Sequence, residues 1–274
     1  MKRAFRFIIK CVLILLVSAI IVIYTVGEGW GERSNYNLLP ESKYTFSHRG
    51  ITIYYPENTQ AAYDAALRAG LNALEIDVSQ TADGRLMAFH DHNEEELLLT
   101  SKRVSEQNWD ELKYTTIYKQ GKPTGQHLLL IDSLFTLYPK TAFYLDMKVH
   151  GSKVANQIAA IIREHKAEKR TIVASSHITT IAHLRHHHPG IITCLEGFKS
   201  GHEWQYAFIP KRYKPDYLAS FIQDIDEEHV VYLRAHDLMH RKITYGVNNN
   251  NVATANEWGI QNCIVDISDT TLIE

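Results

Sequence analysis

Acidic, basic and histidine side chains concentrate between residues 47 and 91 of this 274-residue chain. In Glu75-Ile76-Asp77 the two carboxylates stand two residues apart, and in a β-strand such residues point to the same face. Two neighbouring carboxylates repel each other, so their burial calls for a nearby cation, and oxygen ligands suit a hard divalent ion. The alternative is a solvated strand face or an ion pair with a lysine.

Asp83-Gly84 lies between two apolar runs and is a signal for a two-residue β-hairpin turn. With these two residues in the turn, the hairpin would place His90 opposite Asp77 and His92 opposite Glu75. A histidine beside a possible metal ligand is a candidate general acid or base. The hairpin therefore predicts that an acid/base group and a metal site lie together.

Two further motifs carry groups that suit a phosphate ester. In His48-Arg49-Gly50 the arginine offers a forked donor for phosphate, and the glycine permits a sharp turn or a close ligand. Pro56-Glu57-Asn58-Thr59 opens a predicted helix, where capping accounts for the asparagine and threonine but not for Glu57.

Asp146 and Lys148 repeat the two-residue spacing on a later predicted strand. A simple salt bridge would explain them on a surface, where it is worth little. In an interior strand both charges need partners, and a metal ion together with a phosphate would supply them.

The elements that position these residues alternate between short β-rich runs and longer helical ones, which is typical of an α/β protein with a parallel sheet. Eight strands are predicted, at Thr45 to Gly50, Ala73 to Ser79, Phe143 to Val149, Ile172 to Ser176, Ile191 to Gly197, Tyr217 to Phe221, Ile243 to Val247 and Cys263 to Ile267. Helices are predicted at Thr59 to Ala69, Ser152 to His165, Thr179 to His188, Asp226 to His240 and Asn251 to Trp258.

This order and number of strands predict a (β/α)8 TIM barrel with a β-hairpin after the second strand. An open doubly wound sheet is the alternative, but no G-x-G-x-x-G follows the first strand. The residues from His92 to Ala142 exceed the length of one crossover, so we expect most of them to cross over one end of the barrel.

The N-terminal segment differs from the rest of the chain. Four basic residues begin it, and Cys11 to Val26 carries no charge, so Phe7 to Val26 is long enough to span a bilayer as a helix. We predict a signal anchor at residues 1–26, a tether at 27–42 and a TIM-barrel domain at 43–274. The basic flank predicts a single-pass protein with its catalytic domain outside the cytoplasm. A cleaved signal peptide, which would give a secreted protein, is the alternative, but no A-x-A-like site follows.

Charge and cysteine content argue against nucleic acid as a partner and against a zinc site or a disulfide framework. The chain has a net charge of −2 and its first 26 residues carry +4, which leaves −6 on the remainder and disfavours nucleic acid as a partner. The 3 cysteines show no C-x-x-C spacing, so neither a zinc site nor a disulfide framework is expected.

The motifs follow one order along the chain: H-R-G, P-E-N-T, E-x-D, T-x-D-G, H-D and (D/E)-x-K, then a late strand similar to T-V-N and a last strand that ends in Asp. In this order the chain from Phe46 to Asp266 resembles the glycerophosphodiester phosphodiesterase family. The resemblance implies a (β/α)8 barrel that hydrolyses glycerophosphodiesters to glycerol 3-phosphate and an alcohol, with Ca²⁺ or Mg²⁺ as cofactor.

The resemblance also implies a role for each matching residue. The acid/base pair would be His48 and His90, the metal ligands Glu75, Asp77 and Asp146, and the phosphate- or substrate-binding residues Arg49, Lys148 and Glu57. Three positions depart from the family pattern: Asp146 replaces the usual Glu, Tyr245-Gly246 stands where W-T is usual, and His177 follows Ser175-Ser176 in place of Phe.

The resulting hypothesis is metal-dependent hydrolysis of a glycerophosphodiester or a lysophospholipid-type small molecule by two histidines. One histidine would remove a proton from the attacking hydroxyl, and the other would protonate the leaving oxygen. A phosphatidylinositol-specific phospholipase C-like lyase and a catalytically silent phosphate-binding barrel are the alternatives. The presence of both His48 and His90 favours catalysis.

Overall fold

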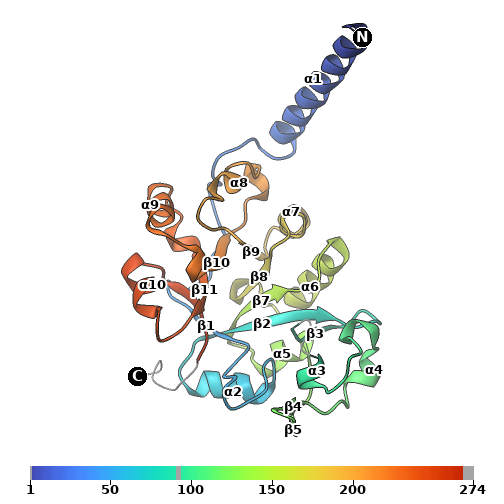
Figure 1. Ribbon diagram of the computed structural model, residues 1–274, viewed down its shortest axis with the longest axis vertical. Helices are drawn as coiled ribbons and strands as arrows, with labels where there is room; N and C mark the ends of the chain where they lie inside the picture. The colour runs from blue at the N-terminus through green and yellow to red at the C-terminus, as the bar shows by residue number, and fades with distance from the viewer. Residues whose placement is uncertain (1, 91–93, 268–274) are drawn as a thin grey trace.

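A closed parallel β-barrel forms the body of the molecule in the computed structural model, which describes residues 2–90 and 94–267 (Figure 1). The barrel closes because β1 pairs in parallel with both β2 and β12. Within the described residues its eight strands are β1 (Thr45–His48), β2 (Ala73–Gln80), β7 (Ala142–Met147), β8 (Thr171–Ser175), β9 (Ile192–Glu196), β10 (Tyr217–Phe221), β11 (Lys242–Val247) and β12 (Asn262–Val265).

Helices lie around the outside of the barrel (Figure 1). In chain order they are α2 (Gln60–Arg68), α5 (Ile131–Leu137), α6 (Ser152–Glu164), α7 (Ile178–His187), α8 (Glu203–Ala207), α9 (Glu227–Ala235) and α10 (Val252–Trp258). The predicted (β/α)8 barrel is confirmed, and each predicted strand overlaps an observed one.

Three helices differ from the prediction. The sequence did not indicate α5 and α8, because seven and five residues are too few for a clear apolar repeat. The α9 helix ends at Ala235 and not at His240, because Asp237 adopts a left-handed backbone conformation with φ 54°.

The two faces of β2 divide the core in the way that its sequence predicts. Leu74, Ile76 and Val78 are buried in the layer between the barrel and the surrounding helices. Glu75 and Asp77 therefore point to the opposite face, into the barrel. The prediction that both carboxylates share one face is confirmed.

The β2–β3 hairpin corrects one prediction. β3 (Leu86–Ala88) pairs with β2 in a register that joins Val78 to Ala88 and continues to Phe89, whose amide donates to the carbonyl of Asp77 (3.1 Å). Phe89, not His90, is thus opposite Asp77. His92, predicted opposite Glu75, lies outside the described residues.

The turn chemistry explains this shift of one residue. The Thr81 amide donates to the carbonyl of Arg85 (3.0 Å), so the loop contains the three residues 82–84 and not two. Gly84 has φ 83°, the left-handed conformation that closes such a three-residue turn. Side chains alternate between the two faces of a strand. One extra loop residue therefore moves each β3 side chain to the face opposite the predicted one.

The long connection after β3 forms a small unit with its own core. Its buried side chains include Phe89, Leu97, Val104 and Leu112. Its elements are α3 (Glu94–Leu97), a 3-10 turn (Val104–Glu106), α4 (Trp109–Leu112), β4 (Tyr118–Lys119), β5 (Lys122–Pro123) and β6 (Leu129–Leu130), and β6 extends the sheet by pairing with β3.

The first helix, α1 (Lys2–Thr25), leaves the molecule beside α8 (Figure 1). Its 22 residues from Ala4 to Thr25 are long and apolar enough to cross a membrane, and the helix does not pack into the barrel. The same length and composition also fit a signal sequence.

Residues 27–39, which we call the N-terminal clasp, pack against the barrel at the N-terminal ends of its strands. Arg33 Nη1 lies 2.9 Å from Oδ1 of the fully buried Asp216, the residue before β10. The Leu39 amide donates to the Tyr217 hydroxyl (3.0 Å), and the Leu39 side chain is buried in the barrel interior. The clasp therefore covers the end of the barrel opposite the strand C-termini.

Glu32 adds a second set of contacts to the clasp. Its carboxylate accepts a hydrogen bond from the Tyr206 hydroxyl (2.6 Å) and lies 3.3 Å from Arg241 Nη1 and 3.5 Å from Lys214 Nζ. Arg241 and Lys214 are buried, so Glu32 supplies negative charge to two cations that water cannot reach.

Candidate active site

A cavity of about 320 Å³ opens at the C-terminal ends of the barrel strands. Its walls combine charged and aromatic side chains from most of the strands. The lining residues are His48, Arg49, Glu75, Tyr144, Asp146, Lys148, Glu196, Phe221, Tyr245, Gly246, Ile264 and Asp266. In a (β/α)8 barrel this is the end at which active sites are built.

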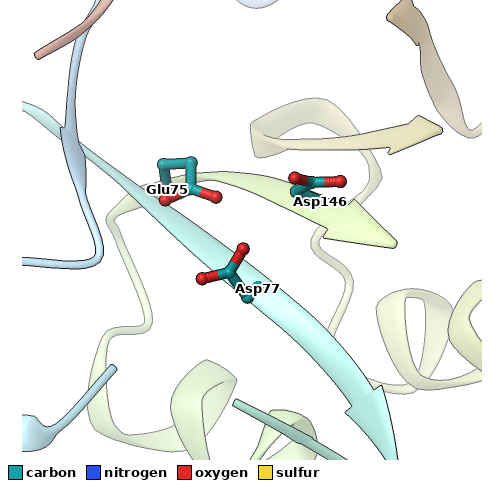
Figure 2. A group of neighbouring side chains, drawn as sticks. All are labelled: Glu75, Asp77 and Asp146. Atoms are coloured by element: carbon teal, nitrogen blue, oxygen red, sulfur yellow. The ribbon is translucent and has the colours of Figure 1, made fainter. Parts of the chain in front are cut away.

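Two carboxylates, those of Glu75 and Asp146, line this cavity, and the fully buried Asp77 lies beside them. Strand register brings the three together. Asp77 on β2 pairs with Asp146 on β7, and Glu75 lies two residues before Asp77 on the same face. One ligand oxygen from each of the three lies within 4.8 Å of the others. Figure 2 shows the two strands side by side with the three carboxylates gathered above them.

Burial strongly affects the charge of Glu75. Burial, together with the Asp77 and Asp146 carboxylates, raises the pKa of Glu75 well above its ordinary value. The side chain would therefore bind a proton unless a further positive charge were present. The cluster has excess negative charge that a cation would relieve.

The surroundings of Asp77, unlike those of Glu75, favour the charged form of the carboxylate. Burial acts to raise the pKa of Asp77, but Arg49 and Lys148 outweigh it and hold that pKa below its ordinary value. Arg49 Nε lies 2.9 Å from Oδ2 and Lys148 Nζ lies 3.1 Å from Oδ1. The Asn58 side chain also donates from Nδ2 to Oδ2 (2.9 Å), so Asp77 is ionised and held in place.

Glu75, Asp77 and Asp146 fit a hard divalent cation. They offer oxygen ligands only, they come from two paired strands that fix their spacing, and two of them are buried. Lys148 already pairs with both Asp77 and Asp146, so its ammonium lies at the edge of the same cluster. An ion at this point would share its carboxylates with a cationic side chain.

His48 ends β1 and is oriented by an acid from the last strand. Its Nδ1 lies 2.5 Å from Oδ1 of Asp266, which directly follows β12. A carboxylate at Nδ1 favours the tautomer with the proton on that nitrogen. Nε2 is then the ring nitrogen that can accept or give a proton, as a general acid or base must.

Arg49 and Gly50 give the chain a sharp turn behind His48. Arg49 has φ 57°, and its amide donates to Glu75 Oε2 (3.0 Å). Gly50 has φ 86°, and a Cβ there would lie 2.6 Å from the backbone of Ala62 in α2. Only glycine fits this turn, which places both the backbone and the side chain of Arg49 against the carboxylate cluster.

The remaining predicted residues lie close to the site. Glu57 Oε2 lies 3.0 Å from Arg49 Nη1, so it supports the arginine from the side away from Asp77. His90 follows β3 and is half-buried, and its charge contributes to lowering the pKa of Asp77. Among the described residues, neither Glu57 nor His90 belongs to the cavity lining.

Sequence reasoning missed Glu196, which ends β9 and lines the cavity. The Tyr144 hydroxyl donates to its Oε1 (2.8 Å). Burial, and next the Asp146 carboxylate, raises the pKa of Glu196 to about 8. Glu196 stood just before Gly197 at the end of a predicted strand, and that position was the signal that could have identified it.

Asn58 and Asp266 were also not assigned to the site from the residues themselves. Asn58 looked like a helix cap, but Thr59 is the N-cap of α2, and Asn58 has φ 55° and turns inward to Asp77. Asp266 entered only as the end of the last strand in the family pattern. A contact between the first and last strands has no local signature in sequence.

Aromatic side chains form the wall opposite the carboxylates. The Phe221 and Tyr245 rings lie 5.6 Å apart, at the ends of β10 and β11. Gly246, with φ 71°, leaves room for Phe221, because a Cβ at position 246 would lie 2.2 Å from that ring. The cavity thus has a charged side and an apolar side.

Comparison with known proteins gives one family match. The model described as the glycerophosphoryl diester phosphodiesterase family matches residues 48–270. A curated glycerophosphodiester phosphodiesterase from Bacillus altitudinis is 28% identical over 147 residues, which are 50% of this chain and 59% of the relative. The alignment with that relative therefore spans less than two thirds of its length.

Solved structures share the fold. A glycerophosphodiester phosphodiesterase from Agrobacterium tumefaciens superposes with a TM-score of 0.68 at 19% identity, over 84% of this chain and 98% of the other. An Oleispira antarctica phosphodiesterase, solved with the product sn-glycerol-3-phosphate, gives a TM-score of 0.64 at 16% identity, over 81% and 92%.

Proposed function

Because the chain belongs to the glycerophosphoryl diester phosphodiesterase family, we propose that it hydrolyses glycerophosphodiesters to glycerol 3-phosphate and an alcohol. The observation that carries the proposal is the meeting, in one cavity, of the oriented His48, the carboxylate cluster and two cationic side chains. Each kind of group helps to cleave a phosphodiester: the histidine transfers protons, and the cation site and the cationic side chains stabilise negative charge on the phosphate oxygens.

His48 and His90 divide the proton transfers in this mechanism. His48, with Asp266 at Nδ1, exchanges its proton through Nε2 with an oxygen at the phosphorus. His90 serves the oxygen on the other side, as the resemblance to the family implies. Each transfer of this kind contributes about 10²- to 10⁴-fold in rate.

Positive charge along the carboxylate side neutralises the phosphate. Asp146 and Asp77 outweigh burial and hold the pKa of Lys148 above its ordinary value, so its ammonium stays charged in the cavity wall. Arg49 keeps its planar fork against Asp77 and Glu57. A divalent ion, Ca²⁺ or Mg²⁺, bound by Glu75, Asp77 and Asp146 would supply further positive charge to the phosphate oxygens.

The substrate is a small phosphodiester rather than a polymer, in keeping with the cavity of about 320 Å³. A glycerophosphodiester or a lysophospholipid headgroup fits the combination of charged and aromatic walls. We place the protein in a membrane through α1, as a single-pass protein with its barrel outside the cytoplasm. The length and apolar character of α1 support this location.

The activity is tested with the full chain in detergent, on glycerophosphocholine, with release of glycerol 3-phosphate as the readout. We expect turnover with Ca²⁺ or Mg²⁺, loss of turnover with a chelator, and a fall of about 10²-fold or more for His48→Ala and for His90→Ala. Unchanged melting temperatures would show that these variants are folded. Near-full turnover by either variant would refute its assignment.

The same assay separates hydrolysis from the lyase alternative. A phospholipase C-like lyase would release a cyclic phosphate, because a substrate hydroxyl and not water attacks the phosphorus. Phosphorus NMR distinguishes the cyclic product from glycerol 3-phosphate. No turnover with any divalent ion would favour a silent binding protein.

A further inference from the structure

An exposed aromatic cluster lies beside the end of α1. Trp204 and Phe208 are 59% and 68% exposed, and their rings lie 6.1 Å apart at 77°. Trp30, 38% exposed, packs edge-on against Tyr24 of α1 at 5.6 Å. Large apolar side chains that gather on a surface usually mark a place of contact.

Hydrogen bonds hold this cluster at the end of the helix. The Trp30 indole donates from Nε1 to the Phe208 carbonyl (3.3 Å). The amides of Lys211 and Arg212 donate to the carbonyls of Gly29 (2.8 Å) and Gly27 (2.9 Å). The segment that follows α8 is thus bonded directly to the residues that follow α1.

Close packing leaves little freedom between the two segments. A Cβ at Gly27 would lie 2.7 Å from Pro210 and 2.7 Å from the Ile23 carbonyl oxygen, so the end of α1 fits against the α8 segment without a gap. Figure 1 shows α8 as the part of the barrel surface nearest to α1. The exposed rings therefore lie near the level at which α1 ends.

The chemistry of these side chains suits a lipid headgroup layer. Tryptophan and tyrosine concentrate at membrane–water interfaces, where an apolar ring and a polar N–H or O–H are both satisfied. Lys211 and Arg212, half-buried beside the cluster, add the positive charge that anionic headgroups attract. A second copy of the chain would bury the rings but would have no need for these cations.

We propose that the barrel rests on the bilayer through the α8 flank, defined as Trp30, Trp204 and Phe208, with the rings in the headgroup layer. This proposal depends on the proposed membrane anchor, because α1 brings the flank to the surface. The rings would enter the boundary between headgroups and acyl chains by about 5–10 Å, as for an interfacial helix. The flank gives the barrel a second membrane contact beside α1.

Tryptophan fluorescence in vesicles that contain brominated phosphatidylcholine and phosphatidylglycerol tests the proposal. The chain has four tryptophans, at positions 30, 109, 204 and 258, so single-tryptophan variants are made by replacing the other three with Phe. The matched control keeps only Trp109, which is half-buried in α4 on the far side of the barrel from α1 (Figure 1). Circular dichroism checks that each variant is folded.

We expect brominated lipid to quench Trp30 and Trp204 by similar factors and to leave Trp109 unchanged. Quenching of Trp30 without quenching of Trp204 would overturn the proposed membrane contact of the flank but not the proposed membrane anchor. If the vesicles fail to retain the protein after a high-salt wash, the proposed membrane anchor is overturned, and the proposed flank contact with it.

Acrylamide, a quencher in the water phase, completes the test. Protection of Trp204 from acrylamide without quenching by brominated lipid would mean that protein, such as a second copy of the chain, covers the flank, and would overturn the proposal. Protection together with lipid quenching supports it. In the variant Phe208→Ser that keeps only Trp204, the lipid quenching of Trp204 should decrease, because half of the apolar pair is lost.

Discussion

At the scale of single residues, the proposed chemistry depends on the contact between His48 and Asp266. The two come from the first and last barrel strands, so the closure of the barrel creates the pair. A carboxylate behind a histidine fixes its tautomer and stabilises its charged form. Asp266 is therefore a positioning residue for His48.

Replacement of Asp266 by Asn should lower kcat by about 10²- to 10⁴-fold and leave KM nearly unchanged, because the amide can hold the wrong tautomer of His48. Steady-state kinetics with glycerophosphocholine measure both constants, and Asp266→Glu, which keeps the charge, should restore part of kcat. A loss confined to KM would show that Asp266 binds substrate and does not position the histidine.

Asp146 carries the second residue-scale prediction. Asp146→Asn should reduce the rise in melting temperature that Ca²⁺ or Mg²⁺ produces, because one of the three carboxylates no longer offers an ionised oxygen. Differential scanning fluorimetry over a range of ion concentrations measures the effect. An equal ion-induced rise in melting temperature in the variant would show that Asp146 is not a ligand of the ion.

The predictable part of the site consists of residues whose spacing is local. Glu75 with Asp77, and Asp146 with Lys148, follow from the two-residue period of a strand. Glu196 was missed because one acid at a strand end has no partner nearby in sequence. The hairpin register failed by one residue because a three-residue and a two-residue turn can both contain Asp83-Gly84.

At the scale of elements, β10 and β11 pack through Phe221 and Gly246. Gly246→Ala should destabilise the fold by about 1–3 kcal/mol, because its Cβ would overlap the Phe221 ring and its backbone is left-handed. Adding Phe221→Ala should cost less than the sum of the two single changes. Urea unfolding of the four proteins gives the coupling energy, and strict additivity would contradict the contact.

Lys242, at the start of β11, makes the stability of the fold depend on pH. Burial, opposed by Cys194, Glu203 and Asp224, lowers the pKa of Lys242 to about 7. Its Nζ donates to the Phe198 carbonyl (2.7 Å) and to Ser220 Oγ (2.6 Å). The unfolded chain binds a proton here between pH 7 and about 10.5, while the folded chain does not.

The contribution of Lys242 to stability is thus greatest at high pH and is lost as the pH falls toward 7. The unfolding free energy of the natural protein, minus that of Lys242→Met, should increase by about 1.4 kcal/mol per pH unit from pH 7 to 10. Urea titrations at each pH test this. A difference that is constant with pH would mean that Lys242 stays charged in the fold.

Helices and strands were predicted correctly where their sequence pattern extends over many residues, and they were missed where it covers only a few. Alternating β-rich and helical runs specified the barrel, and strands overlap their predicted ranges throughout the described chain. The five residues of α8 carry no measurable repeat, and α8 lies on the flank that we assign to the membrane. The exposed ring of Trp204 in α8 also departs from the usual pattern of a surface helix.

At the scale of the whole molecule, the N-terminal clasp joins α1 to the barrel through buried charge. Asp216 accepts hydrogen bonds from the Thr193 amide and hydroxyl (2.9 Å each) and lies 2.9 Å from Arg33 and 3.4 Å from Arg185. Two arginines therefore depend on one fully buried carboxylate.

Asp216→Asn should destabilise the protein by about 3–5 kcal/mol, because it leaves Arg33 and Arg185 without their negative partner. The control is Asp110→Asn, which breaks an exposed ion pair with Lys113 and should have no measurable effect. Melting curves of the full chain in detergent measure both. Equal stability of the two variants would show that the clasp contributes little to the fold.

The clasp also sets how the proposed enzyme would search for substrate. As a flexible coil, the clasp and the three residues after it, 16 residues from 27 to 42, would have a root-mean-square span of about 22 Å and would let the barrel move through a thick shell of water. The contacts of Glu32, Arg33 and Leu39 remove that freedom. On a membrane anchor, the cavity would keep a constant height above the bilayer and would sample substrate by two-dimensional diffusion within a thin layer of solution.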